Sequence, residues 1–198
     1  MALLPVADAL ARLLADAVPL PSEQVDLIAA SGRVLATPLI ALRTAPPFDA
    51  SAMDGYAVKA TDVAQLPAKL RVIGEAAAGR GFRGTIAAGE AVRIFTGAPI
   101  PVGADAIHIQ ENCHREGDLV IVREGSPDPT YIRPRGGDFS QGAALLDAGT
   151  TLAARQLTLA AAMGHATVPV HRRPKVAILA SGDELVLPGA ALGPDQIV

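Results

Sequence analysis

The sequence predicts a multidomain α+β protein in which a β-rich domain lies between mixed segments and a further α/β domain begins near the end. Three observations support this fold class. Glycine (19 residues) and proline (16 residues) are more frequent than a helical bundle tolerates. Short alternating β patterns fill residues 44–140, whereas helical spacing occurs only on either side of them. Half of the chain is hydrophobic, which argues against disorder.

A helix is predicted near the N-terminus, within residues 1–21. Pro5 precedes it, where a missing N–H costs nothing, apolar residues then recur at helical spacing, and closely spaced prolines end it. The mixed segment that follows is expected to hold a short strand at residues 25–27, a helical turn at 31–36 and an apolar extended run at 39–42.

Alternation of apolar side chains predicts several short strands in the β-rich domain. The clearest cover residues 92–96, 107–109 and 120–122. A helical pattern then returns at residues 152–163, with a glycine directly after it to end the last turn, and a short strand is expected at 166–170.

The final segment has a different pattern. Residues 175–180 form an apolar run without alternation, which is typical of a parallel strand buried on both faces. Only 18 residues follow it, and they contain Pro188, Gly189, Gly193 and Pro194, so they cannot complete a βαβ unit. We therefore expect the chain to stop at the start of an α/β domain.

Composition excludes two classes of partner. The net charge of −3 provides no positive field for a phosphate backbone, and an aromatic content of 3% leaves few rings for base stacking. No apolar stretch approaches the roughly 20 residues that a membrane span needs. The single cysteine, Cys113, allows no internal disulfide and fits a reducing compartment. We expect a cytoplasmic protein with no nucleic-acid or membrane partner.

Two local patterns are weak site candidates. Residues 79–84 have G-x-G-x-x-G spacing, but only residues 85–89 separate them from the next predicted strand, which is too short for the helix of a dinucleotide site. His108, Cys113 and His114 lack the spacing of a metal site, and adjacent strand residues point to opposite faces. A turn and ordinary strand residues are the better interpretations.

Four loops carry functional chemistry more convincingly, although each is by itself an ordinary turn. They are residues 46–57, 96–101, 133–138 and 181–184. Between them they supply hard oxygen donors suited to Mg²⁺ and groups suited to oxyanions. The donors are Asp54, Asp138, Asp183 and Glu184, and the anion-binding groups are Thr96, Gly97, Arg133 and Arg135. This chemistry predicts a site for a phosphorylated ligand with Mg²⁺.

Longer stretches around these loops match one family in order and spacing. They are PPFDASAMDGYAV from Pro46, IFTGAPIPVGADAIHIQE from Ile94, IRPRGGDFSQGAALLDAGT from Ile132 and KVAILASGDELVLPG from Lys175. Through them the chain resembles the N-terminal portion of the molybdopterin molybdenumtransferase family, the MoeA proteins and the E domain of gephyrin. The resemblance spans essentially all 198 residues.

The resemblance implies an architecture that agrees with the segmentation above. An N-terminal helix occupies residues 1–21, an elongated mixed linking domain residues 22–44 and 139–172, and an inserted β-rich domain residues 45–138. Residues 173–198 are then the start of a truncated, MogA-like α/β domain that binds molybdopterin.

The resemblance also implies an activity. Family enzymes insert molybdenum from molybdate into adenylylated molybdopterin with Mg²⁺ and release AMP, and they act as homodimers whose cleft combines domains of both subunits. Carried over by motif, Asp54, Asp138 and Glu184 are implied as catalytic and metal-binding residues. The implied substrate-binding residues are Thr96, Gly97, Arg135, Ser181, Gly182 and Asp183.

Two functions are compatible with the family. The first is this enzyme of molybdenum cofactor synthesis, expected to be inactive as a fragment because the chain stops inside the α/β domain. The alternative is a non-catalytic binding or scaffold module of the gephyrin E-domain type. Carboxylates in the loops favour the enzyme, because a pure scaffold does not need them there.

Overall fold

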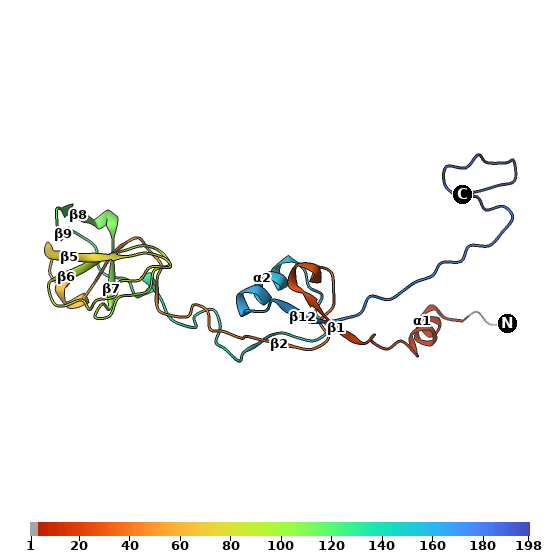
Figure 1. The fold of residues 1–198 in the computed structure, drawn as a ribbon, viewed down its shortest axis with the longest axis horizontal. Coiled ribbons are helices and arrows are strands. Elements are labelled where there is room, and N and C mark those ends of the chain that lie inside the picture. The colour runs from red at the N-terminus through yellow and green to blue at the C-terminus, as the bar shows by residue number, and fades with distance from the viewer. Residues whose placement is uncertain (1–3) are drawn as a thin grey trace. The chain divides into compact units, whose positions relative to one another are not determined.

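The computed structural model describes residues 4–198, which form two compact units. One unit contains the described part of Met1–Glu23 together with His171–Val198, and the other contains Gln24–Val170. Figure 1 shows the path of the chain through both. The mixed α+β class is confirmed, whereas the predicted domain bounds remain a prediction. No helix among residues 4–198 is long and apolar enough to cross a membrane.

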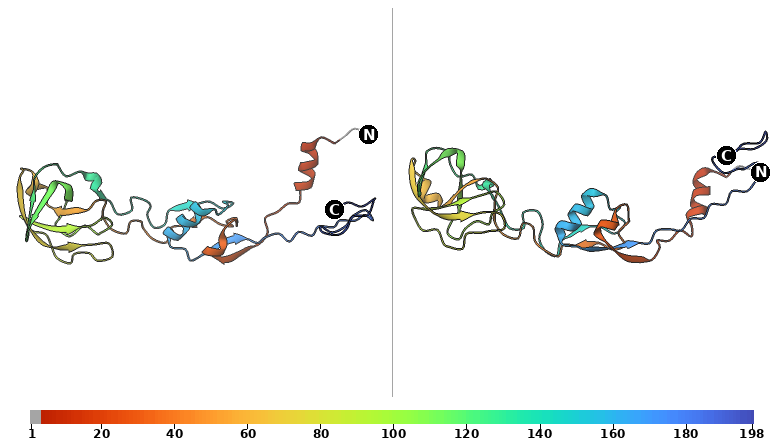
Figure 2. Two further views of the ribbon diagram at one scale, coloured as in Figure 1. Left: turned by 90° about the horizontal axis from the view of Figure 1, so that it is seen from above. Right: turned by 45° about the horizontal axis from the view of Figure 1, so that its top comes forward.

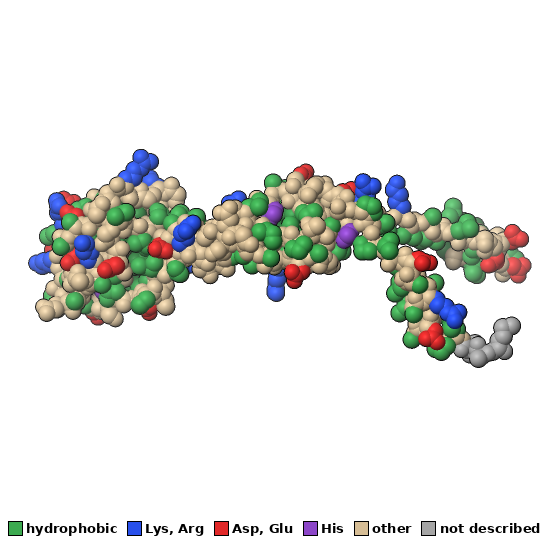
Figure 3. Space-filling model, turned by 90° about the horizontal axis from the view of Figure 1, so that it is seen from below, with side chains coloured by type: hydrophobic (Ala, Val, Ile, Leu, Met, Phe, Trp, Pro, Cys, Tyr) green, Lys and Arg blue, Asp and Glu red, His purple; other side chains and the backbone are tan. Residues whose placement is uncertain are grey.

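The unit formed by the chain ends contains a single helix among its described residues, α1 (Val6–Leu14). The helix follows Pro5, as predicted, and Ala9 N–H donates to the Pro5 carbonyl at 3.0 Å. None of its side chains is buried, and Val6 is 85% exposed. The space-filling view in Figure 3 shows hydrophobic side chains on the surface of this helix.

The parallel strand predicted at residues 175–180 is wrong. This segment has no regular structure, and Ile178 and Leu179 are each 92% exposed. A strand forms only when neighbouring strands take up its N–H and C=O groups, and none pairs with this segment. Further along, Leu185 and Ile197 form one parallel bridge, closed by Val186 N–H donating to the Ile197 carbonyl at 2.9 Å.

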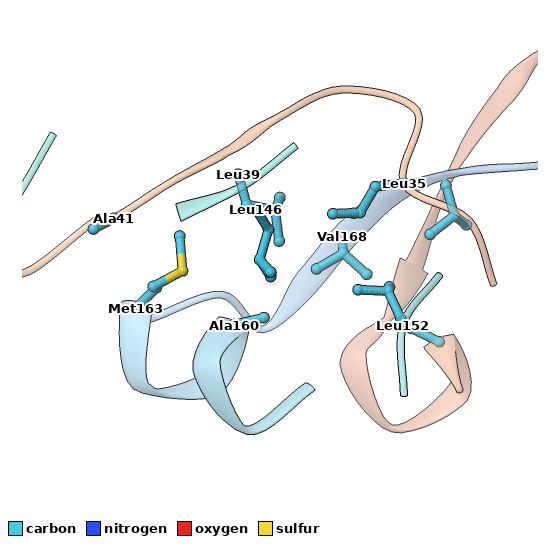
Figure 4. Close-up of a cluster of buried hydrophobic side chains, with 10 residues drawn as sticks. Leu35, Leu39, Ala41, Leu146, Leu152, Ala160, Met163 and Val168 are labelled. Carbon is cyan, nitrogen blue, oxygen red and sulfur yellow. The ribbon is translucent and has the colours of Figure 1, made fainter. Parts of the chain in front are cut away.

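The Gln24–Val170 unit has one of its cores around the helix α2 (Ala154–Met163). The elements around it are strand β1 (Ser22–Asp26), the 3-10 turn η1 (Leu27–Ala30), and strands β2 (Leu39–Ile40), β11 (Ala144–Leu146) and β12 (Thr167–His171). Strand β1 pairs with β12, and β2 pairs antiparallel with β11. Figure 4 shows Leu35, Leu146, Leu152, Met163 and Val168 packed together in this core.

The helix predicted at residues 152–163 is confirmed as α2, whereas the helical turn predicted at residues 31–36 is wrong. The helix ends at Gly164, which has a φ of +100°. The helical turn lies earlier, at η1, because Leu35 and Ala36 are drawn into extended pairing. Their N–H groups donate to the carbonyls of Thr150 and Pro169 at 2.9 and 3.0 Å. Tertiary partners therefore override the local preference.

An antiparallel ribbon leads from this core to the β-rich region. Ala45 N–H donates to the Phe139 carbonyl at 2.9 Å, and Asp138 N–H donates to the Ala45 carbonyl at 3.0 Å. The ribbon ends in the pair β3 (Ala50–Ser51) and β10 (Ile132–Arg133). These short strands hold the loop before residue 50 and the loop after residue 133 beside one another.

The β-rich region is a curled sheet (Figure 2). Its six strands have the order β7-β4-β6-β5-β9-β8. Its strands are β4 (Gly55–Val58), β5 (Ala68–Ala76), β6 (Glu90–Ile94), β7 (Ala106–Ile109), β8 (Cys113–Glu116) and β9 (Leu119–Val122). The 3-10 turns are η2 (Ala60–Val63), η3 (Gln110–Asn112) and η4 (Pro129–Tyr131). All neighbouring strands are antiparallel except β5 and β6.

Alternate residues of β4, β6 and β7 pack into two different clusters, one on each face of this part of the sheet. One cluster contains Leu70, Val120 and Val122, and the other contains Ile94 and Ile107. The connection from β5 to β6, which carries the G-x-G-x-x-G pattern, contains no helix. The interpretation of that pattern as a turn is therefore confirmed.

Candidate functional site

Asp54 and Thr96, 42 residues apart in the sequence, are joined by two hydrogen bonds. Strand β4 begins at Gly55, strand β6 ends at Ile94, and these two residues are register partners. The residues just outside the two strands therefore meet. The backbone N–H and the Oγ1 hydroxyl of Thr96 both donate to Asp54 Oδ1, each at 2.8 Å.

These bonds hold the Asp54 carboxylate in its charged form. The pKa of Asp54 is lowered, first by the Thr96 backbone N–H, then by the Thr96 hydroxyl, with a further contribution from the positive charge of Arg93. No hydrogen bond among residues 4–198 engages the second oxygen, Oδ2. At neutral pH the site therefore presents one anionic oxygen with free lone pairs.

Gly97 continues the same loop and packs it against strand β3. Its φ is +82°, a left-handed conformation that favours glycine. Its N–H donates to the Ser51 carbonyl at 2.8 Å, and Ser51 N–H donates to the Ala98 carbonyl at 2.9 Å. The predicted residues Asp54, Thr96 and Gly97 therefore form one cluster.

Asp138 and Arg135 lie on the ribbon, with partners that the sequence does not reveal. Nη2 of Arg133 donates to both oxygens of Asp138, at 2.8 and 3.0 Å. Arg135 N–H donates to Asp49 Oδ1 at 2.7 Å, and its Nε donates to the Pro47 carbonyl at 3.1 Å. The two arginines were expected to face an anion together, but Arg133 is neutralised within the loop, so only Arg135 lacks a carboxylate ion pair.

Ser181, Gly182, Asp183 and Glu184 lie in the other compact unit. They form a turn in which Leu185 N–H donates to the Gly182 carbonyl at 3.1 Å. The expectation that this turn follows a buried strand is wrong, because the strand is absent. Among residues 4–198, no three His, Cys, Asp or Glu side chains gather in a group that could hold a metal ion. The carboxylates with lone pairs to offer are Asp54, through Oδ2, and Asp138, whose two Arg133 bonds leave further acceptor capacity.

Three further residues shape the site: Arg93 lies outside the four predicted loops, whereas Asp49 and Ser51 lie within the predicted loop 46–57 but were given no individual role. Arg93 donates to the Gly55 carbonyl at 2.7 Å, and its guanidinium carbon lies 4.5 Å from the ring centroid of Phe95. Asp49 anchors the Arg135 backbone, and Ser51, 1% exposed, donates its hydroxyl to the Met53 carbonyl. The alternation in β6 marks Arg93 as a residue on the face opposite Val92, but nothing local identifies its partners.

The weaker candidates form no metal site. His108 is buried in β7, whereas Cys113 and His114 are consecutive residues of β8. Burial raises the pKa of Cys113 to about 11, which keeps it a neutral thiol and a poor metal ligand at neutral pH.

Comparison with known proteins identifies the family. A family model described as the MoeA N-terminal region (domain I and II) matches residues 4–164. A molybdopterin molybdenumtransferase of Nostoc sp. is 41% identical over 181 residues, which are 89% of this chain and 42% of that protein. One from Haemophilus influenzae is 39% identical over 180 residues, covering 90% of this chain and 44% of that protein.

Solved structures agree. A crystal structure of the molybdopterin biosynthesis MoeA protein from Pyrococcus horikoshii superposes with a TM-score of 0.84 at 37% identity, covering 96% of this chain and 52% of that one. The chain thus spans less than half the length of these two curated relatives. On the match over residues 4–164 and on these identities, the chain belongs to the MoeA family, whose N-terminal region it contains.

Proposed function

We propose that this chain acts in molybdenum cofactor biosynthesis as the N-terminal part of a molybdopterin molybdenumtransferase. The reaction inserts molybdenum from molybdate into adenylylated molybdopterin and releases AMP. Family membership supports the chemistry, and one observation supports the site: the ionised Asp54 carboxylate, held by two Thr96 hydrogen bonds, keeps one oxygen free.

The proposal assigns distinct roles to the site residues. Asp54, Asp138 and Glu184 are the carboxylates that would hold Mg²⁺ in this proposal, and the bound ion would supply positive charge near the departing AMP phosphate. Thr96 orients Asp54, and the Gly97 backbone lets substrate approach closely. In the C-terminal segment, Ser181, Gly182 and Asp183 contact the molybdopterin substrate in this proposal, and Arg135 contributes positive charge toward oxyanions.

We also propose that the protein is a cytoplasmic homodimer. The 198 residues alone are expected to be inactive. The exposed side chains of Val176, Ile178 and Leu179 support this expectation, because a strand with these apolar residues is stable only within a sheet. The lengths of the curated relatives, of which the chain spans less than half, also support it.

A chimera tests the proposal directly. This chain replaces the matching region of the Haemophilus influenzae molybdopterin molybdenumtransferase, to which it is 39% identical. AMP release and molybdenum incorporation are measured with adenylylated molybdopterin, molybdate and Mg²⁺. We expect activity from the chimera and none from the 198-residue chain, and a loss of about 100-fold in the Asp54→Asn chimera because it removes a charge positioned at the reacting phosphate.

The matched control is Asp128→Asn. Asp128 has the same local arrangement as Asp54, accepting bonds from the N–H and hydroxyl of Thr130 at 2.8 and 2.7 Å, and its pKa is likewise lowered. It lies outside the candidate site and should leave activity unchanged. An active Asp54→Asn chimera would contradict the assigned role of Asp54, and an inactive chimera with the unaltered chain would contradict the function.

A further inference from the structure

A cavity of about 470 Å³ opens beside the ribbon, away from the Asp54–Thr96 cluster. One ribbon strand supplies Arg43 and Thr44, the other supplies Arg135 and Gln141, and Ala162 of α2 closes one side. Leu42 N–H donates to the Met163 carbonyl at 2.9 Å and Gln141 N–H donates to Thr44 Oγ1 at 3.1 Å, so backbone bonds hold the walls together.

Arg135 is held in place by hydrogen bonds, and Arg43 lies against the end of α2. Gly164 leaves room for Arg43: a Cβ at this glycine would lie 2.7 Å from Arg43 Nε. Arg135 is fixed at Nε by the Pro47 carbonyl at 3.1 Å, and its N–H is bound by Asp49. Part of the entropy cost of ordering Arg135 around a ligand is therefore already met.

Neither guanidinium has a carboxylate partner. Within residues 4–198, no Asp or Glu oxygen lies within 4.0 Å of the Arg43 or Arg135 side-chain nitrogens. By contrast, Arg71, Arg80 and Arg133 each form an ion pair of this kind. The cavity therefore carries two positive charges that no neighbouring carboxylate compensates.

A purely structural role explains only part of this arrangement. Arg43 lies at the C-terminal end of α2, where a cation interacts favourably with the helix dipole. That role does not involve Arg135, Gln141 or the open cavity beside them. An anion that accepts hydrogen bonds from both guanidinium groups accounts for all of these features, because arginine forks match the oxygens of phosphate-like groups.

We propose that this cavity is a binding site for a small tetrahedral oxyanion of the phosphate and molybdate class, held by Arg43 and Arg135. Gln141 and Thr44 offer further polar groups at its wall. Asp54 and Thr96 do not line the cavity, whereas Arg135 is the residue to which the proposed function gives a role toward oxyanions. Anion binding here can be measured without the proposed reaction. A higher affinity for molybdate than for phosphate would rest on the proposed function. The cavity would then be a binding site for the molybdate substrate.

Isothermal titration calorimetry on the 198-residue chain tests the site, with sodium molybdate and sodium phosphate as separate ligands and chloride of matched ionic strength as the control. We expect saturable binding of one equivalent of anion. Arg43→Gln and Arg135→Gln should each weaken binding by about tenfold, because each removes one charge-assisted contact. Arg155→Gln removes the same charge from α2 outside the cavity and should bind as the unaltered chain does.

The outcomes separate the alternatives. Tighter binding of molybdate identifies the site with the substrate, and equal binding identifies a general oxyanion site; both support the proposal. No saturable binding of either anion, or equal loss in Arg155→Gln, would overturn it. Urea unfolding midpoints of all variants show whether a loss of binding reflects a loss of folding. Because no catalytic turnover is measured, failure here leaves the chimera experiment unaffected.

Discussion

Replacing Gly55 with alanine is the sharpest test of the sheet that positions Asp54. The φ of Gly55 lies outside the left-handed region, so its role is close approach and not backbone freedom. A Cβ at this position would lie 2.0 Å from the His108 carbonyl oxygen and 3.0 Å from the Ile109 Cα. Both contacts are with backbone of the neighbouring strand β7, which cannot rotate away as a side chain could.

The magnitude follows from this contact. Relief of a 2.0 Å approach to at least 3.0 Å requires β4 and β7 to separate by about 1 Å. Overpacking of this kind costs about 1–3 kcal/mol. The β4–β7 ladder contains four residue pairs, and weakening two of its hydrogen bonds adds about 1 kcal/mol each. We therefore expect the free energy of unfolding to fall by about 3–5 kcal/mol.

Tyrosine fluorescence during urea unfolding measures this loss. The chain has two tyrosines and no tryptophan, and both tyrosines, Tyr56 and Tyr131, pack against the β-rich cores. Gly89→Ala is the control, because a Cβ there meets nothing within 4 Å and only the φ of +75° is unfavourable, at about 1 kcal/mol. A Gly55→Ala protein no less stable than this control would refute the reasoning.

Three further predictions concern titratable groups. Thr96→Val removes one of the two bonds that lower the pKa of Asp54, so carboxyl NMR titration should show that pKa rising toward its ordinary value; no change would contradict the assigned cause. Burial lowers the pKa of His108, so the unfolded chain takes up the proton more readily and stability should fall as pH drops through and below 6.5. In His108→Leu the urea midpoint should depend less on pH between about pH 7.5 and about pH 5.5, and an unchanged pH dependence would argue against His108 as its source. Cys113, with a pKa of about 11, should react with iodoacetamide much more slowly in the native chain than in urea at the same pH, and equal rates would show that it is not shielded.

Sequence patterns correctly predicted the elements whose conformation depends on residues close together along the chain. The helix at residues 152–163 and its end at Gly164 follow from apolar spacing and a left-handed glycine, and the structure has α2 there. Strand β7 was also predicted, from side chains that alternate between two faces. In the structure Ala106 packs into one cluster and Ile107 into the other. The predictions at 31–36 and 175–180 were wrong because those segments take their conformation from partner strands, present in one case and absent in the other.

In the candidate site, too, sequence patterns predicted individual residues, and the fold determined which of them meet. The motifs named Asp54, Thr96 and Gly97 as residues of interest, but their association depends on the pairing of β4 with β6 and on the backbone bonds between Ser51 and the loop at Gly97. The ion pair between Arg133 and Asp138, by contrast, joins residues only five apart, yet sequence alone could not distinguish it from two free groups facing a ligand. Spacing limits which side chains can meet, and the backbone turn decides which do.

The sequence by itself determined the family, the α+β class and the chemical character of the loops, because motifs and periodicity are properties of neighbouring residues. Only the tertiary structure decided which charges are compensated. Arg133 is neutralised, Arg43 and Arg135 are not, and Asp54 keeps one free oxygen. Electrostatic compensation depends on distances of a few ångströms between residues that can be far apart along the chain, and folding sets those distances.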